Sequence, residues 1–378
     1  MNYYIIPKNN CKIKLKLYIT PEKISPCISY SLIHYLTAVC TQLFKLDDVL
    51  SDIKIDFIKQ IINPFEFINT NVPGSVISVS KVKPDSNIFF ELTEIFQTCG
   101  ILDALSSRSS MNIAHLTPNG SSSNYLINIL REDCNDTVIN EDFNYEKIYN
   151  TFIRQHVQIK LDLIIIEFNP EDLNNSGVYI KNMLLILCII IKYQSNLGTC
   201  IIKIDHIFYK AIIDIIFIFS GIYDKVFLIK PSISKITTGE RYIVCKSLNV
   251  DLIHKMQLLD QVENNICNAN YEVALNLHNI HSVIDNDISY YFLNKIEESN
   301  TVIGQQQIAA YIQIINIFNN KNRDDKIETL KRHHIQKCIQ WCEKNKIPHN
   351  KFADKINVFL MLKNKDTNFP SISLNCVQ

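Results

Sequence analysis

The chain is poor in glycine and tryptophan and has no excess of either charge. Its 378 residues include 8 glycines and 1 tryptophan, and 38 basic residues balance 38 acidic ones. It has neither a G-x-x-x-x-G-K-[ST] phosphate loop nor a G-x-G-x-x-G dinucleotide motif, so the sequence offers no sign of these two nucleotide sites. Because the net charge is zero, any affinity for RNA must come from a local patch.

Long apolar runs and secretion signals are also lacking. The longest uncharged apolar run, 183–191, is too short to span a bilayer. Met1–Lys8 carries only five apolar residues before its first charge. Twelve cysteines are scattered without a C-x-x-C pair, which favours reduced thiols. We therefore expect a cytoplasmic protein with no membrane partner.

What is present is a globular composition, 47% hydrophobic and 20% charged, with strand and helix patterns that alternate in the middle of the chain. This alternation predicts an α/β fold with a Rossmann-type, mostly parallel sheet covered by helices on both faces. The expected strands are 112–116, 162–168, 200–204, 225–229 and 242–246, and the expected helices are 88–99, 124–131, 145–155, 180–193 and 207–223.

The length fits two or three domains. We expect an N-terminal α/β extension (1–80), a Rossmann-type domain (81–250) and a mostly helical C-terminal region (251–378). The extension should hold a strand at 12–19 and helices at 31–44 and 47–62, and the C-terminal region helices at 308–318, 326–344 and 352–362. The polar stretch 131–142 is predicted to be a loop.

Two charged residues stand beside buried strands, where packing alone needs neither charge. Lys203 lies in C-I-I-K-I-D at the end of one predicted strand, and Glu240 opens E-R-Y-I-V-C-K at the start of another. A structural ion pair would be the simplest interpretation of the two. The second string, preceded by K-P-x-x-S, is specific enough to favour an inherited active site.

These segments resemble the FtsJ-like (RrmJ-like) ribose 2′-O-methyltransferases, and most closely their eukaryotic and large-DNA-virus cap-methylating branch. The resemblance implies a Rossmann-type sheet, S-adenosylmethionine as cofactor and a Lys-Asp-Lys-Glu tetrad. Lys203 and Glu240 match its third and fourth members. At the first two positions this chain has Glu91, in F-F-E-L-T-E-I, and Glu167, in D-L-I-I-I-E.

The resemblance also implies a cofactor loop where the family has A-x-P-G-G and this chain has L-T-P-N-G from Leu116. Free amides at a helix start can hold the carboxylate of a small ligand. A well-capped helix without a ligand is the alternative. Glu132, Asp133 and Asp136 are open candidates for the ribose-binding acid. The predicted cofactor-binding residues are Pro118, Asn119, Gly120 and Ser121.

A lysine acts as a base only when it is neutral, and nearby carboxylates raise its pKa. If Lys203 faces Glu91, Glu167 and Glu240, the surplus of negative charge should keep it protonated. Either the first lysine comes from elsewhere, with Lys81 and Lys83 nearby in sequence, or the site has lost or changed its activity.

Lys230, Lys235 and Arg241 flank the expected pocket and are predicted to contact RNA phosphates, although charged loops are often merely solvated. His334 and Cys338 lie one helical turn apart, as do Cys338 and Cys342. Three ligands along one helix diverge too far for a tetrahedral ion, so we expect a packed helix and no metal.

The leading hypothesis is a S-adenosylmethionine-dependent mRNA cap ribose 2′-O-methyltransferase acting on capped RNA. The alternative is a catalytically degenerate scaffold or RNA-binding subunit of a capping, polyadenylation or polymerase complex. A third possibility is a Rossmann-type protein for another ligand, for which the sequence offers no motif. If the protein is viral, we expect it to be located in the cytoplasm of the host or in the virion.

Overall fold

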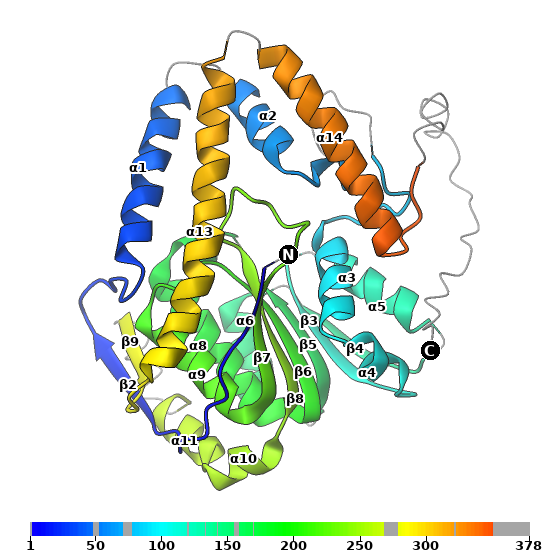
Figure 1. Cartoon of the computed structure of the whole chain (residues 1–378). Helices are drawn as coiled ribbons and strands as arrows, with labels where there is room; N and C mark the ends of the chain where they lie inside the picture. Colours follow the sequence, from blue (N-terminus) through cyan, green and yellow to red (C-terminus); the bar gives the residue numbers. More distant parts are fainter. Residues whose placement is uncertain are drawn as a thin grey trace.

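The computed structural model describes residues 2–47, 53–70, 78–118, 121–132, 134–141, 143–154, 159–168, 170–267, 279–320 and 323–350. A seven-stranded sheet lies at its centre, with helices on both faces (Figure 1). Its strands are β1 (Asn2–Ile5), β3 (Asn112–Leu116), β4 (Thr137–Glu141), β5 (Leu161–Glu167), β6 (Gln194–Ile204), β7 (Tyr223–Lys230) and β8 (Arg241–Leu248). A separate pair is formed by β2 (Leu15–Thr20) and β9 (Asn279–Ile284).

The strand order is β1-β7-β8-β6-β5-β3-β4. Strands β4, β3, β5 and β6 pair in parallel, whereas β8 is antiparallel to both β6 and β7. Strand β7 therefore points the same way as β6, and β1 closes the edge in the opposite direction. The prediction of a mostly parallel α/β sheet is confirmed.

This strand order contains a reversal that matters for ligand binding. From β3 the chain goes first to β4 on one side and then to β5 on the other. The carboxyl ends of β3 and β5 thus flank a topological switch point. In open α/β sheets ligands bind at such points.

Each face of the sheet has its own core because side chains alternate along a buried strand. In β5, Ile164 and Ile166 belong to one core, and Leu163 and Ile165 to the other. The first core lies under α8 (Ser176–Tyr193) and α9 (Lys210–Ile222), and the second under α3 (Ile88–Thr98) and α5 (Ser121–Leu130). Helix α8 is long and apolar enough to cross a membrane by length and composition alone, but 72% of it is buried in this fold.

A further layer of helices lies beyond the carboxyl edge of the sheet (Figure 1). Helix α13 packs against α1 and α2, and α14 packs against the second core. Their bounds are α1 (Tyr30–Asp47), α2 (Ile53–Ile62), α13 (Tyr290–Phe318) and α14 (Arg323–Lys344). The other helices are η1 (Glu66–Ile68), α4 (Leu102–Ser106), α6 (Tyr145–Tyr149), the π-helix η2 (Asn150–Arg154), α7 (Pro170–Asn174), α10 (Val250–Lys255) and α11 (Leu258–Asn265).

The mostly helical C-terminal region is confirmed, with β9 as an exception. The loop predicted at 131–142 is wrong in its second half, because Thr137–Glu141 forms β4. This edge strand is polar and half exposed, and so lacks the apolar signal of a buried strand. The helix predicted at 352–362 lies outside the described residues. The boundaries at 80 and 250 stay predictions, although β1 is hydrogen-bonded into the central sheet.

Candidate functional site

The four positions matched to the tetrad meet at the carboxyl edge of the sheet. The Lys203 Nζ lies 3.0 Å from Glu167 Oε1, 3.3 Å from Glu91 Oε2 and 3.7 Å from Glu240 Oε2. The lysine side chain is only 14% exposed. Within the described part of the chain, Lys203 is the only cation in ion-pair contact with any of these three carboxylates.

Strand register brings most of this cluster together. Lys203 is paired with Glu167 across the parallel β5–β6 ladder and with Tyr242 across the antiparallel β6–β8 ladder. Helix α3 supplies Glu91, which accepts a hydrogen bond from the Tyr242 hydroxyl. Side chains from α3, β5, β6 and the residue before β8 therefore converge, as the resemblance in sequence implied.

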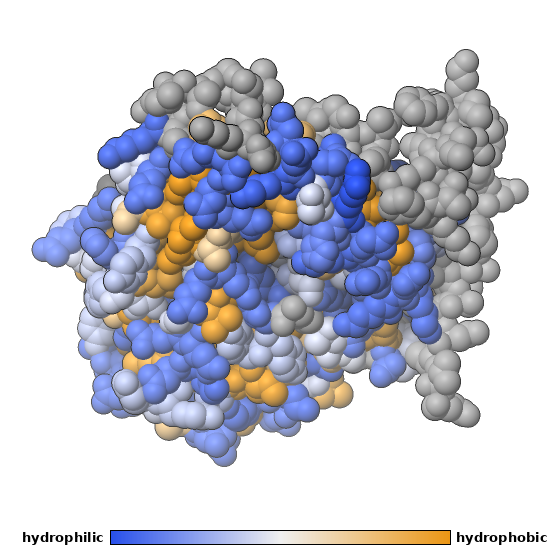
Figure 2. Space-filling model, turned by 45° about the horizontal axis from the view of Figure 1, so that its top comes forward, coloured by the Kyte–Doolittle hydropathy of each residue, from blue (hydrophilic) through white to orange (hydrophobic). Residues whose placement is uncertain are grey.

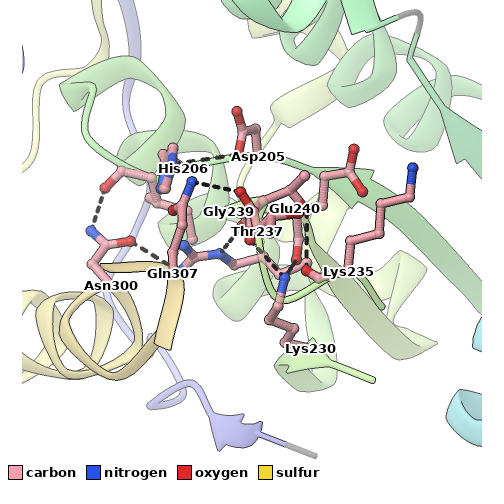
Figure 3. A network of polar contacts seen from close by, with 12 residues as sticks. Asp205, His206, Lys230, Lys235, Thr237, Gly239, Glu240, Asn300 and Gln307 are labelled. Carbon is pink, nitrogen blue, oxygen red and sulfur yellow. Dashed lines mark hydrogen bonds and ion pairs between the residues drawn. The ribbon is translucent and has the colours of Figure 1, made fainter. Parts of the chain in front are cut away.

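The loop 231–240 that carries Glu240 is held from several sides. The Glu94 carboxylate accepts hydrogen bonds from the Ser232 backbone N–H and hydroxyl and from Trp341 Nε1 of α14. From α13, Gln307 donates to the Thr237 carbonyl at 3.1 Å (Figure 3). A loop fastened in this way keeps Glu240 at a fixed position beside Lys203.

Gly239 is required by close packing next to the site. A Cβ atom built there would lie 2.2–2.6 Å from the imidazole of His206, which is itself stacked on Phe208. We expect Gly239→Ala to destabilise the protein by about 1–3 kcal/mol through overpacking, and to displace the loop that carries Glu240. Chemical denaturation measures this change. Gly100→Ala is an unsuitable control because Gly100 has φ of 58°.

Gly177→Ala is the matched control for Gly239→Ala. A Cβ atom there would come no nearer than 3.0 Å to Asn279 Oδ1, the end of a movable side chain. An equal loss of stability in both variants would contradict the packing argument.

The electrostatics of the cluster keep the lysine charged. Burial by itself lowers the pKa of Lys203, but Glu91, Tyr242, Glu167 and Glu240 together raise it well above its ordinary value. Burial raises the pKa of Glu167, whereas the pKa of Glu240 is lowered because Lys203 and other lysines outweigh its burial. The expectation that Lys203 stays protonated agrees with this environment.

Two of the three predicted RNA contacts are corrected by the structure. Lys230 is 3% exposed and donates to the carbonyls of Thr238 and Glu240, both at 2.9 Å. Arg241 is fully buried and donates to Ser299 and Asn300 of α13. Both side chains are buried and hydrogen-bonded within the protein, so neither lies where it could reach a phosphate in solution. Only Lys235 of this set is exposed.

The buried Lys230 gives a pH-dependent prediction. Burial, with a contribution from Arg241, lowers its pKa from 10.5 to about 8. Between these values the folded state holds fewer protons than the unfolded one, so stability rises with pH. Relative to Lys230→Met, the wild type should gain up to about 3 kcal/mol of unfolding free energy over this range. Urea titrations of both proteins at several pH values test this, and a pH-independent difference would contradict it.

The turn between β3 and α5 contains unsatisfied polar groups. Thr117 is 2% exposed, and its Oγ1 has no partner among the described residues. The same holds for both ring nitrogens of the fully buried His115 and for Oδ1 of Asn124. Burial lowers the pKa of His115 to about 4, so this imidazole is neutral. Buried polar atoms of this kind normally have a water or ligand partner.

Of these groups, the Thr117 hydroxyl directly follows the carboxyl end of β3 at the switch point, and a buried hydroxyl without a partner there is compatible with a polar small molecule such as S-adenosylmethionine. Pro118 is half buried in the turn and Ser121 begins α5, whereas Asn119 and Gly120 lie outside the described residues. Sequence reasoning did not select His115 or Thr117 as candidates, because the absence of a partner for their polar atoms is visible only in the fold.

Glu141, which is ion-paired with Lys147, is a further candidate for the ribose-binding acid that the sequence did not single out. It ends β4 at the carboxyl edge, next to the end of β3, which is where ribose-binding acids lie in dinucleotide folds. Of the earlier candidates, Asp136 is excluded because it precedes β4 at the opposite edge and is paired with Arg131. Glu132 is exposed, and Asp133 lies outside the described residues.

The packed-helix interpretation of the histidine and cysteine residues in α14 fits their burial. His334, Cys338 and Cys342 are buried, and both cysteines belong to the second core. No group of three potential metal ligands occurs among the described residues.

Comparisons with known proteins add little. No protein-family model matches this chain, and no curated protein is detectably similar to it. Among solved structures, it is similar to a protein named as a ribosomal RNA methyltransferase from Plasmodium falciparum. The identity is 14% and the TM-score 0.32, over 43% of this chain and 97% of the other. A likeness this weak carries no argument about function, and the α/β fold stands on the sheet topology described above.

Proposed function

We propose that this protein is a S-adenosylmethionine-dependent RNA ribose 2′-O-methyltransferase that acts on capped RNA. The observation that carries the proposal is the convergence of Glu91, Glu167, Lys203 and Glu240 beside a topological switch point. Four positions far apart in the sequence align with a catalytic tetrad and occupy one cluster, and two of them, Lys203 and Glu240, keep the residue of the family. A purely structural ion pair needs only two of them.

Several residues suit the binding of the methyl donor. Thr117 and the start of α5 would face its polar end, and Glu141 would accept hydrogen bonds from its ribose. When bound, S-adenosylmethionine supplies an electrophilic methyl group. The role of the protein is to hold a ribose 2′-oxygen in line with that group, which lowers the barrier by orientation.

For the RNA, the described surface near the cluster offers Lys235. Its ammonium lies close enough to lower the pKa of Glu240, and its side chain is exposed. One exposed lysine is a small electrostatic footprint. We therefore expect weak, salt-sensitive RNA binding by this chain alone.

The proposal is tested by incubating the full chain with capped RNA and methyl-labelled donor, followed by nucleoside mass spectrometry. Label on a ribose 2′-oxygen is the expected result, together with donor binding measured by calorimetry. Absence of transfer to the capped RNA would refute the proposal, whether or not the donor binds.

A second function is favoured by the substitutions in the tetrad and by the surface. Glutamate stands where the family has its first lysine, which leaves one cation facing three carboxylates. Apolar side chains also reach the surface on the face shown in Figure 2. Apart from that view, the large exposed aromatic side chains of α1 and α13 are Tyr30, Tyr35, Phe44, Tyr290 and Tyr291.

These features fit a catalytically degenerate subunit that binds RNA or a protein partner in a capping, polyadenylation or polymerase complex. RNA binding that is unaffected by Lys203→Ala, with no turnover by the wild type, would support this function. Turnover that Lys203→Ala abolishes would exclude it.

A further inference from the structure

The contacts of Lys203 differ in kind. Among the described residues, its contact with Glu167 at 3.0 Å has hydrogen-bond geometry, whereas those with Glu91 and Glu240 are ion pairs at 3.3 and 3.7 Å. An ammonium has three donors. Lys203 can therefore remain bound to Glu167 and still donate to a substrate oxygen.

The three carboxylates are not equally suited to accept a proton. Glu91 is 4% exposed and already accepts a hydrogen bond from the Tyr242 hydroxyl. Glu240 has a lowered pKa, which makes it the weaker base. Glu167 has a side chain that is 22% exposed, a second carboxylate oxygen with no hydrogen-bond donor among the described residues, and a place at the switch point.

We infer, on the basis of the proposed methyl transfer, that Glu167 accepts the proton of the ribose 2′-hydroxyl while Lys203 stays protonated and donates to the same oxygen. In this reaction the 2′-oxygen forms a bond to the methyl carbon as the methyl–sulfur bond breaks. The sulfonium of the donor becomes a neutral thioether, and the hydroxyl proton passes to the free oxygen of Glu167. The cation of Lys203 stabilises negative charge that develops on the attacking oxygen.

The charged surroundings support these roles. Burial raises the pKa of Glu167 despite the opposing effect of Lys203, and the carboxylates of Glu91 and Glu240 raise it further. The other titratable groups that face the cluster are Tyr242 of β8, Lys230 of β7 and Lys235 of the loop. With the pKa of Lys203 raised well above its ordinary value, the neutral amine is far scarcer than the Glu167 carboxylate at neutral pH.

Methyl-transfer rates of three full-length proteins test the inference on capped RNA. Arginine cannot act as a base, so Lys203→Arg should keep at least about a tenth of the wild-type rate, whereas Glu167→Gln should lose about 100-fold or more. The wild-type rate should rise through the acidic pKa of a carboxyl group and stay level from about pH 7 to about pH 9. An inactive Lys203→Arg variant that folds as the wild type does would overturn the inference, and so would a wild-type rate that climbs to alkaline pH.

A second measurement does not depend on turnover. Carbon-13 NMR of glutamate carboxyl groups follows the titration of the donor-free protein, and Glu167→Gln assigns the resonance. A Glu167 carboxyl group that titrates above the ordinary glutamate value is expected, and one at or below it would overturn the inference. A wild type that binds the donor but transfers nothing would refute the proposed function, and the inference with it. An active wild type with inactive Lys203→Arg would refute the inference alone.

Discussion

Replacing Lys203 by methionine is expected to lower the free energy of unfolding at neutral pH by about 3 kcal/mol. The reason is that Glu91, Glu167 and Glu240 would then face one another without the cation that contacts all three. Removal of one partner from a buried ionic cluster leaves uncompensated charge. Urea denaturation of both proteins, followed by circular dichroism, measures the difference.

The loss should depend on pH with a definite sign. Without Lys203 the pKa values of Glu167 and Glu240 rise in the folded state, because like charges disfavour ionisation. The folded variant then binds more protons than its unfolded form, and the loss grows as pH rises through the ordinary glutamate range. It should be smallest at acidic pH and complete at neutral pH. A loss that is the same at both would contradict this electrostatic account.

The matched control is Lys295→Met. Lys295 pairs with Glu298 at 2.7 Å on the exposed side of α13. Surface pairs of this kind contribute about 0–1 kcal/mol, so the control should be nearly neutral.

Arg241→Met is expected to cost about 2–3 kcal/mol of unfolding free energy, because it removes the hydrogen bonds of a buried charged donor. Arg241 is fully buried at the start of β8 and donates to the Gly239 carbonyl at 3.1 Å, as well as to Ser299 and Asn300 at 3.0 Å. Its loss leaves buried acceptors unpaired and separates α13 from the edge of the sheet. A variant within about 1 kcal/mol of the wild type would show that this network adds little.

The main features of the sheet could be predicted from sequence because its central strands are β-branched runs buried on both faces. Asn112–Leu116 was predicted with its observed bounds, and β5 to within one residue at each end. By contrast β4 is short and half exposed, and β1 and β9 pair with strands more than 200 residues away in the chain. Such strands lack a local signal, since distant partners stabilise them.

In the candidate site, too, features with a local sequence signal could be predicted and features that depend on distant partners could not. The motifs around Lys203 and Glu240 led to the cluster, and matches at Glu91 and Glu167 located its other two members. The burial of Lys230 and Arg241 could not be predicted, because most of the partners that hold Arg241 lie about 60 residues later, in α13. Both residues were assigned to RNA since their local sequence shows only a basic loop. Glu141 was missed together with its strand.

The chemistry of the cluster follows from its charges, which are one lysine and three carboxylates. A single lysine among three carboxylates is suited to donate hydrogen bonds and to stabilise an oxyanion, and poorly suited to remove a proton. If the protein transfers methyl groups, a carboxylate has to accept the proton. If it does not, the same cluster holds β5, β6, β8 and α3 together at the edge where a substrate would bind.

The most direct test of the central claim is a crystal structure of the full chain with S-adenosylhomocysteine. The product should lie between the carboxyl ends of β3 and β5, in contact with Thr117, while Lys203 Nζ stays within ion-pair distance of Glu91, Glu167 and Glu240. A ligand bound elsewhere, or a Lys203 side chain directed away from these carboxylates, would contradict the account.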